Sequence, residues 1–221
     1  VLALTAFDEG AGEALFAGGA FTAAAGQPAN RIARWSGSDW STLGSGMNNE
    51  VRALAVFDDG AGDALFAAGN FTSAGGVAAN RIARWNGSSW SALASGLDSS
   101  VRSLGVFDDG TGEGLYATGL FTSAGGVAAN RIARWNGSAW SALAGGLSGG
   151  MLPVVHAQAV FDDGGGAALY AGGSFTSAGG VAASNVARWN GSSWSALGSG
   201  TNGDVDALAV FDDGSGAALY A

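Results

Sequence analysis

The chain has 221 residues and a formal net charge of −9, because nine arginines and no lysine face 18 acidic residues. An acidic surface repels phosphate backbones and anionic bilayers, so nucleic-acid binding is not expected. The absence of cysteine excludes disulfides and thiol catalysis, and histidine chemistry would depend on the single residue His156. We therefore predict no cofactor and no metal site.

The sequence repeats itself about every 50 residues. A Phe-Asp-Asp/Glu-Gly signature recurs at intervals of 50, 50, 54 and 50 residues, at Phe7, Phe57, Phe107, Phe161 and Phe211. An Ala-Arg-Trp run follows in four repeats, with a second tryptophan five residues after the first: Trp35 and Trp40, Trp85 and Trp90, Trp135 and Trp140, Trp189 and Trp194. The predicted units are residues 1–50, 51–100, 101–154 and 155–204, with a half unit over residues 205–221.

Each repeat is predicted to hold four strands, as residues 51–100 illustrate. The first strand covers residues 51–57 and ends in an Asp-Asp-Gly turn, and the second covers residues 64–72. A glycine-rich connection over residues 73–76 leads to a third strand at residues 80–85 and a fourth at about residues 90–93. Between the last two, the pair Asn86-Gly87 favours a tight primed hairpin turn.

Four antiparallel strands in a unit of this length are typical of a β-propeller blade. We therefore predict an all-β chain that forms a β-propeller of four complete four-stranded blades plus a half blade, 18 strands in all. The alternative is a β-solenoid. In a solenoid, equivalent strands of successive repeats pair with one another, whereas in a propeller neighbouring strands of one repeat pair.

The segments Leu65-Phe66-Ala67-Ala68-Gly69 and Leu169-Tyr170-Ala171-Gly172-Gly173, together with the spaced tryptophans, resemble kelch repeats. The longer pattern Leu-Tyr-Ala-Gly-Gly-x-Phe-Thr-x-Ala-Gly-Gly, followed by Ile-Ala-Arg-Trp-Asn-Gly-Ser-x-Trp, is similar to the Rax2-type repeats of secreted and cell-surface propellers. This resemblance covers essentially the whole chain. It implies a β-propeller that is secreted or displayed at the cell surface and has no shared catalytic residues.

The acidic turns and the arginines of the third strands are predicted to meet on one rim. Paired carboxylates are also compatible with calcium binding or with glycosidase chemistry. However, a feature that occurs in every repeat indicates a structural role, and the sequence Asp-Asp-Gly forms a tight turn. Arg84 is expected beside Asp58 or Asp59. The predicted structural ion pairs involve Arg34, Arg84, Arg134 and Arg188 with the acidic turns, including Asp58, Asp108 and Asp162.

Two further features concern binding. The tryptophan pairs are compatible with sugar stacking, but their spacing favours cross-strand packing partners that flank a hairpin. The repeats differ from one another at the second position of the first strand and in the loops between repeats, where recognition usually occurs. The candidate ligand-binding residues are therefore Asn48, Arg52, Asp98, Arg102, Leu152, His156, Asn202 and Asp206.

The function expected from these features is a non-enzymatic, extracellular or surface scaffold that binds a protein or a glycan through the loops between blades. Two alternatives stay open: a polysaccharide hydrolase or lyase that uses channel carboxylates such as Asp206, and a recently amplified or engineered repeat array without a specific ligand. We expect no membrane span. Self-association through the edges of the half blade is a further expectation.

Overall fold

The computed structural model describes residues 1–10 and 12–221, and within these ranges every regular element is a β-strand. Each full repeat forms a four-stranded antiparallel sheet. Sheet 1 contains β1 (Ala3–Asp8), β2 (Glu13–Gly18), β5 (Ile32–Trp35) and β6 (Trp40–Thr42). Sheet 2 contains β7 (Val51–Asp58), β8 (Asp63–Gly69), β11 (Ile82–Trp85) and β12 (Trp90–Ala92).

The second half of the chain repeats this order of strands. Sheet 3 contains β13 (Val101–Asp108), β14 (Glu113–Gly119), β17 (Ile132–Trp135) and β18 (Trp140–Ala142). Sheet 4 contains β20 (Val154–Asp162), β21 (Ala167–Ser174), β24 (Val186–Trp189) and β25 (Trp194–Ala196). The terminal hairpin consists of β26 (Ala209–Asp212) and β27 (Ala217–Tyr220). The predicted all-β class and the antiparallel four-stranded units are confirmed, and pairing within each repeat contradicts the β-solenoid alternative.

The glycine-rich connection that the sequence predicts over residues 73–76 is part of a small hairpin. In the second repeat β9 (Ser73–Ala74) pairs with β10 (Val77–Ala78), and Gly75 and Gly76 between them have φ angles of 58° and 85°. Two positive φ angles define a primed turn, which glycine adopts without steric cost. The equivalent strands are β3 (Ala23–Ala24) and β4 (Gln27–Pro28), β15 (Ser123–Ala124) and β16 (Val127–Ala128), and β22 (Ser177–Ala178) and β23 (Val181–Ala182).

The predicted primed turn at Asn86-Gly87 is wrong. Trp85 pairs directly with Trp90, so four residues form the loop, and only Gly87 among them has a positive φ. The loop is closed by the Asn86 side chain, whose Oδ1 accepts hydrogen bonds from the backbone N–H groups of Ser88 and Ser89 at 3.0 and 2.9 Å. An asparagine that bonds its own loop in this way replaces the backbone turn that Asn-Gly would otherwise make.

The first strand of the half repeat is shorter than predicted, because β26 begins at Ala209 rather than at residue 205. Its register pairs Ala209 with Tyr220. Residues 205–208 form no regular strand, although Val205 is buried and its N–H donates a hydrogen bond to the carbonyl oxygen of Gly173 in sheet 4 at 3.1 Å.

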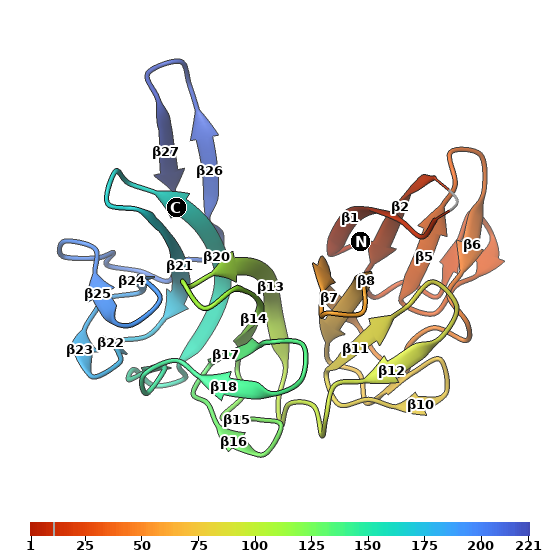
Figure 1. The fold of residues 1–221 in the computed structure, drawn as a ribbon, viewed down its shortest axis with the longest axis horizontal. Helices are drawn as coiled ribbons and strands as arrows, with labels where there is room; N and C mark the ends of the chain where they lie inside the picture. The colour runs from red at the N-terminus through yellow and green to blue at the C-terminus, as the bar shows by residue number, and fades with distance from the viewer. Residues whose placement is uncertain (11) are drawn as a thin grey trace.

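The sheets stand around a common centre in an open arc (Figure 1). The first strand of each repeat lies toward the centre, as β7, β13 and β20 show, and the fourth strands β6, β12 and β25 lie outside (Figure 1). Sheet 1 and the terminal hairpin flank the open side. The described residues do not close a ring. They contain no helix long and apolar enough to cross a membrane.

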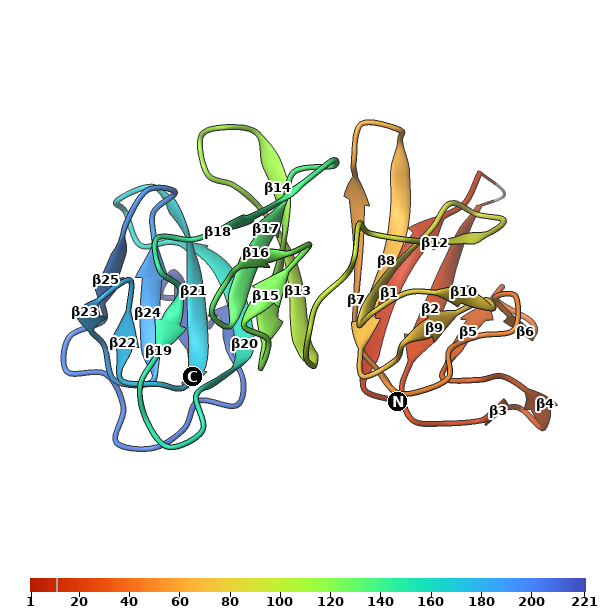
Figure 2. The same cartoon turned by 90° about the horizontal axis from the view of Figure 1, so that it is seen from below.

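The arc has two rims. The turns that join β7 to β8 and β13 to β14 lie at one edge, and the N-terminus lies at the other (Figure 2). We call the first edge the turn rim; it carries the acidic turns and the loops between third and fourth strands. We call the second edge the loop rim; it carries the connections between repeats, at residues 43–50, 93–100, 143–153 and 197–204. The connection between sheets 3 and 4 also forms a short strand, β19 (Leu147–Ser148), which pairs with β22.

The hydrophobic core lies between successive sheets. We call the face turned to the next sheet the forward face and the other the backward face. Between sheets 2 and 3, Phe57 and Phe66 of the forward face pack in one cluster with Leu115, Trp135 and Trp140 of the backward face. The same pattern recurs between sheets 1 and 2 and between sheets 3 and 4. Burial of each such side chain contributes about 1.5–3 kcal/mol, so adjacent repeats stabilise one another.

Candidate functional site

Three of the candidate ligand residues on the loop rim lie on β-bulges. The registers of β7, β13 and β20 shift so that Arg52, Arg102 and His156 face no residue on the neighbouring second strand. A bulge bends the strand and redirects the extra side chain. The same backbone irregularity therefore presents different chemistry in successive repeats. Asp206, the equivalent residue of the half repeat, precedes β26.

A polar network links sheets 2 and 3 at this rim. Arg52 Nη2 lies 2.6 Å from Glu50 Oε2, and the same oxygen accepts a hydrogen bond from Asn70 Nδ2 at 3.1 Å. Ser100 Oγ in turn donates to Asn70 Oδ1. The network neutralises Arg52 and ties the inner strand of sheet 2 to the loop that precedes sheet 3.

The side chain of Arg102, by contrast, has no ion pair and no hydrogen bond to any residue of 1–10 or 12–221. Its Nε is buried without a partner. Burial lowers the pKa of its guanidinium, the positive charge of Arg52 lowers it further, and Glu50 acts in the opposite direction. An arginine stays charged under these conditions. Because Glu50 offsets the charge of Arg52, the guanidinium of Arg102 is the positive charge that remains here without a counter-ion among the described residues, and it suits a carboxylate or sulfate group.

His156 and Asp206 lie close together, with His156 half-buried and Asp206 open to solvent. His156 Nε2 is 3.8 Å from Asp206 Oδ1, and the Asp206 side chain is 87% exposed. A glycosidase or lyase requires two carboxylates in unlike, enclosed environments. Asp206 is not enclosed in this way, so its environment does not favour the hydrolase alternative.

Asn48 and Asp98 hold the loop rim together. Asp98 Oδ1 accepts hydrogen bonds from the backbone N–H groups of Thr122 and Ser123 at 2.9 and 3.1 Å, and Asp98 Oδ2 accepts one from Thr122 Oγ1 at 2.7 Å. Burial would raise the pKa of Asp98, but these hydrogen bonds outweigh it and the pKa is lowered. Asn48 Oδ1 accepts the two equivalent backbone bonds from Thr72 and Ser73, but Asn48 Nδ2 donates a hydrogen bond to Thr72 Oγ1 at 2.9 Å. Both side chains therefore clip a loop to the hairpin of the next sheet.

The inserted loop before sheet 4 presents apolar side chains to solvent. Leu152 is 82% exposed and its neighbour Met151 is 99% exposed. The loop is anchored at its end, where Arg131 Nε donates a hydrogen bond to the carbonyl oxygen of Pro153 at 2.8 Å. Asn202, in the following loop, is also exposed. Adjacent exposed apolar residues at an anchored loop tip form the kind of surface that contacts a partner.

On the turn rim, each third-strand arginine is paired with an acidic turn of its own sheet. Arg84 Nε lies 2.6 Å from Asp59 Oδ2. The equivalent pairs join Arg34 to Glu9 at 2.8 Å, Arg134 to Asp109 at 3.2 Å and Arg188 to Asp163 at 3.4 Å.

The arginine partner is the second acid of each turn, not the first. The first acids predicted as partners, Asp58, Asp108 and Asp162, instead close the turn. Asp58 Oδ1 accepts hydrogen bonds from the N–H groups of Gly60 and Gly62 at 2.8 and 2.9 Å, and Asp108 and Asp162 do the same in their own turns. An aspartate that bonds the backbone two residues ahead is an Asx turn, which leaves it less free to pair.

In sheets 3 and 4 a tyrosine joins these pairs. Tyr116 Oη donates a hydrogen bond to Asp109 Oδ2 at 3.0 Å. Burial raises the pKa of Tyr116, and the hydrogen bond to Asp109 and its charge raise it further. Burial would also raise the pKa of Asp109, but hydrogen bonds from Thr111 and Tyr116 and the charge of Arg134 lower it. The acid thus stays ionised inside a small structural network.

The tryptophan pairs are cross-strand packing partners. Trp85 and Trp90 lie opposite each other, with ring centroids 5.2 Å apart, and both are nearly buried between sheets 1 and 2. The sequence reading missed a bond between repeats: Trp85 Nε1 donates to Glu9 Oε1 at 2.5 Å. The only signal for it in the sequence is that glutamate stands at residue 9, where the other turns have aspartate.

Comparison with known proteins adds no relative: no family model, no curated protein and no solved structure matches this chain. Among residues 1–10 and 12–221, no three acidic or histidine side chains gather in a group that could hold a metal ion. The candidate site therefore depends on the geometry of the loop rim alone.

Proposed function

We propose that the chain is a kelch-like, Rax2-type β-propeller scaffold of four complete blades and a half blade, which binds a protein or a glycan at its loop rim without catalysis. Secretion or display at the cell surface belongs to the same proposal. The observation that carries it is the distribution of variation. The turn rim repeats the same Arg–acid pairs, whereas the loop rim presents Arg102, His156 and Leu152 at equivalent or neighbouring places.

The chemistry of the loop rim indicates what it binds. Arg102 offers a positive charge for an acidic sugar or a carboxylate side chain, and the Met151–Leu152 tip offers apolar area on the same rim. Together they favour a ligand with both an anionic group and an apolar face. A rigid scaffold beneath these loops limits the entropy lost on binding.

The test is a binding screen of the chain against immobilised glycans and surface proteins, followed by the same screen with Leu152→Asp and with Arg102→Ala. We expect at least one ligand whose affinity falls tenfold or more in one of these variants. Ala139→Asp is the matched control, because it places the same charge on the turn rim at the position where the first repeat naturally has Asp39. If every ligand found binds both loop-rim variants as tightly as the unchanged chain, the proposal is wrong.

A further inference from the structure

Two equivalent pockets lie on the loop rim, one between sheets 1 and 2 and one between sheets 2 and 3. We call them the first and the second rim pocket; their volumes are about 310 and 340 Å³. Each forms where the loop between two repeats meets the residues before a third strand and the small hairpin of the next sheet. Among the residues that line them are three equivalent pairs: Arg31 and Arg81, Asn30 and Asn80, and Asn48 and Asp98.

The same contacts shape both pockets. Gly96 lies so close to Asn80 that a Cβ on this glycine would collide with the carbonyl oxygen of Asn80. The side chain of Asn80 then holds the loop, because its Nδ2 donates a hydrogen bond to the carbonyl oxygen of Ser95 at 3.0 Å. Gly46 and Asn30 make the equivalent contacts in the first rim pocket. Both pockets are therefore fixed by the fold before a ligand arrives, which limits the entropy lost on binding.

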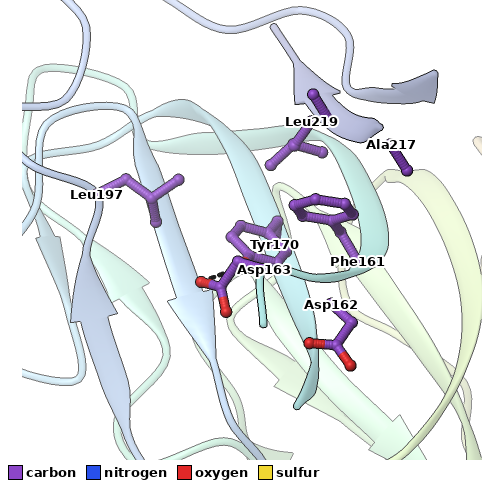
Figure 3. Close-up of a pocket in the computed structure, with 8 residues that line it drawn as sticks. Phe161, Asp162, Asp163, Tyr170, Leu197, Ala217 and Leu219 are labelled. Atoms are coloured by element: carbon purple, nitrogen blue, oxygen red, sulfur yellow. Dashed lines mark hydrogen bonds between the residues drawn. The ribbon is translucent and has the colours of Figure 1, made fainter. Parts of the chain in front are cut away.

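The arginine of each rim pocket lacks an acidic partner, unlike the arginines of the turn rim. There Arg188, for example, lies 3.4 Å from Asp163, whose carboxylate also accepts a hydrogen bond from Tyr170 Oη at 2.9 Å (Figure 3). Within residues 1–10 and 12–221, neither Arg31 nor Arg81 takes part in an ion pair. Each rim pocket thus holds a positive charge that a ligand can approach.

Backbone carbonyl groups occupy only one side of these guanidinium groups. Arg81 Nη1 donates to the carbonyl oxygens of Asn70 and Phe71 at 2.7 and 3.2 Å, and Arg31 Nη1 donates to that of Phe21 at 3.0 Å. The Nη2 atoms of both arginines donate to no described residue. Because a guanidinium has five N–H donors, each arginine keeps donors for a ligand.

The backbone at this position does not require arginine. Arg31 and Arg81 both have a φ of 66°, a left-handed conformation that asparagine adopts more readily than arginine. The fourth repeat indeed has Asn185 there, with a φ of 64°. In the third repeat, the Nε of the equivalent Arg131 is taken by the carbonyl oxygen of Pro153 in the inserted loop. The free arginine donors are therefore a property of the first and second rim pockets.

The two rim pockets differ in charge at one position. Asp98 lines the second, and its Oδ2 accepts one hydrogen bond, from Thr122 Oγ1, which leaves room for another donor. Asn48 lines the first, where no residue of the lining is acidic. The second rim pocket therefore offers a cation and an anion together, which suits adjacent hydroxyl groups because each is both donor and acceptor. The first offers a cation alone, which suits a carboxylate.

The rest of the lining favours a sugar over a peptide anchor. The apolar residues of the lining, Met47 and Leu97, are each only 3% exposed. A peptide side chain that anchors an interface needs accessible apolar area. Serine hydroxyl groups line both rim pockets instead, at Ser45, Ser73, Ser95 and Ser123.

We propose that each rim pocket binds one sugar residue of a glycan, a uronic acid in the first and a neutral hexose in the second. The carboxylate of the uronic acid pairs with Arg31. Two adjacent hydroxyl groups of the hexose donate to Asp98 and accept from Arg81. This inference rests on the proposed function, because it takes the loop rim as the binding face and names the glycan residues that its pockets accept.

The test is a titration of the ¹⁵N-labelled 221-residue chain with free hexoses and hexuronic acids of gluco, galacto and manno configuration, followed by two-dimensional NMR. The amides of Gly76 and Gly126 report the two pockets separately, because each lines its own pocket and donates to no described backbone carbonyl. We expect at least one uronic acid to bind the first rim pocket about twofold to fivefold more tightly than its neutral counterpart, and the order to reverse at the second.

Exchanging the residue that differs tests the role of charge. Asn48→Asp should turn the preference of the first rim pocket to the neutral sugar, and Asp98→Asn should turn that of the second to the uronic acid. Both variants keep the fold, because Asn48 and Asp98 accept equivalent hydrogen bonds from the backbone of the next hairpin.

Removing one arginine tests whether the two pockets act independently. Arg81→Asn should weaken sugar binding at Gly126 and leave binding at Gly76 unchanged, and asparagine already adopts this backbone conformation at Asn185. Ala139→Asp is the control matched in net charge, because it also adds one negative unit but lies on the turn rim; it should change neither site.

The proposal is wrong if neither amide responds to any sugar up to about 50 mM, or if the two exchanges leave the preferences unchanged. If acetate shifts the Gly76 amide as strongly as the uronic acids do and no neutral hexose binds, the pockets accept carboxylates of any kind, including those of peptides, and the sugar assignment is wrong. These failures are distinct from a failure of the proposed function, which the screen with Leu152→Asp and Arg102→Ala decides.

Discussion

The hydrogen bond between Glu9 and Trp85 provides a test of how adjacent repeats hold together. Glu9 Oε2 lies 2.8 Å from Arg34 Nε while its Oε1 accepts the bond from Trp85 Nε1, so one carboxylate serves its own sheet and the next. At the next interface Asp59 pairs with Arg84 in the same way, but Nε1 of Trp135 is buried without a partner. The side chain of aspartate is one methylene shorter. We therefore expect Glu9→Asp to destabilise the protein and Asp59→Glu to stabilise it.

The size of the effect follows from burial. Trp85 is 7% exposed and the Glu9 side chain is 13% exposed, so water replaces the lost bond only in part. Leaving a buried N–H without an acceptor costs about 1–3 kcal/mol, and we expect about 1–2 kcal/mol for Glu9→Asp. The gain from Asp59→Glu should be smaller, about 0.5–1 kcal/mol, because the added methylene must fit into a packed interface. For a chain of this length each kcal/mol corresponds to about 2–4 °C in melting temperature.

The assay is thermal unfolding followed by tryptophan fluorescence and checked by calorimetry at pH 7. Glu9→Gln is the control, because glutamine keeps one oxygen acceptor at the same reach for Trp85 Nε1, while its NH2 group replaces the oxygen that faces Arg34 and the charge is lost; it should fall between the unchanged chain and Glu9→Asp. The opposite signs of the two carboxylate exchanges are the essential result. If both exchanges move the melting temperature in the same direction, or neither moves it, the bond between repeats does not contribute as argued.

Two further predictions concern stability. Because hydrogen bonds lower the pKa of Asp98, its contribution to stability is present above about pH 4 and is lost as the pH falls through its lowered pKa in the folded protein; Asp98→Asn should therefore flatten the decrease in melting temperature between pH 5 and 3, and an unchanged slope would contradict this. Gly137 and Gly37 both have a φ of 98°, but a Cβ at Gly137 would lie 2.4 Å from the carbonyl oxygen of Asp59, whereas one at Gly37 meets nothing within 4 Å. Calorimetry should therefore show Gly137→Ala to be more destabilising than Gly37→Ala by about 1–3 kcal/mol. Equal effects would mean that the backbone at Asp59 moves away from the new Cβ without a loss of stability, and would contradict the prediction.

Much of this architecture could be predicted from local patterns. The 50-residue period, the position of each main strand and the cross-strand tryptophan pairs depend on turns and alternation within a few residues, and such signals are visible in sequence. The placement of arginines on the rim of the acidic turns followed from strand direction alone. Which of Asp58 and Asp59 pairs with Arg84 could not be predicted, because it depends on which carboxylate accepts the backbone hydrogen bonds of the turn.

Other features depend on distances that no local pattern encodes. The glycine-rich segment that contains Gly75 and Gly76 indicates a flexible connection in the sequence, but it forms a hairpin in the structure. The bulges at Arg52 and Arg102 arise from the pairing between strands. The role of Asp98 as a clip requires a residue 24 positions away in the next repeat.

The amino-acid sequence by itself determined the repeat, its antiparallel strands and the chemistry available at each turn, because hydrophobic alternation and turn residues act over short separations. The tertiary structure alone decided which side chains meet across repeats and which of the described residues carry the bulges of the loop rim. These outcomes depend on how successive twisted sheets pack face to face, and that packing is set by the sum of many weak contacts rather than by any single motif.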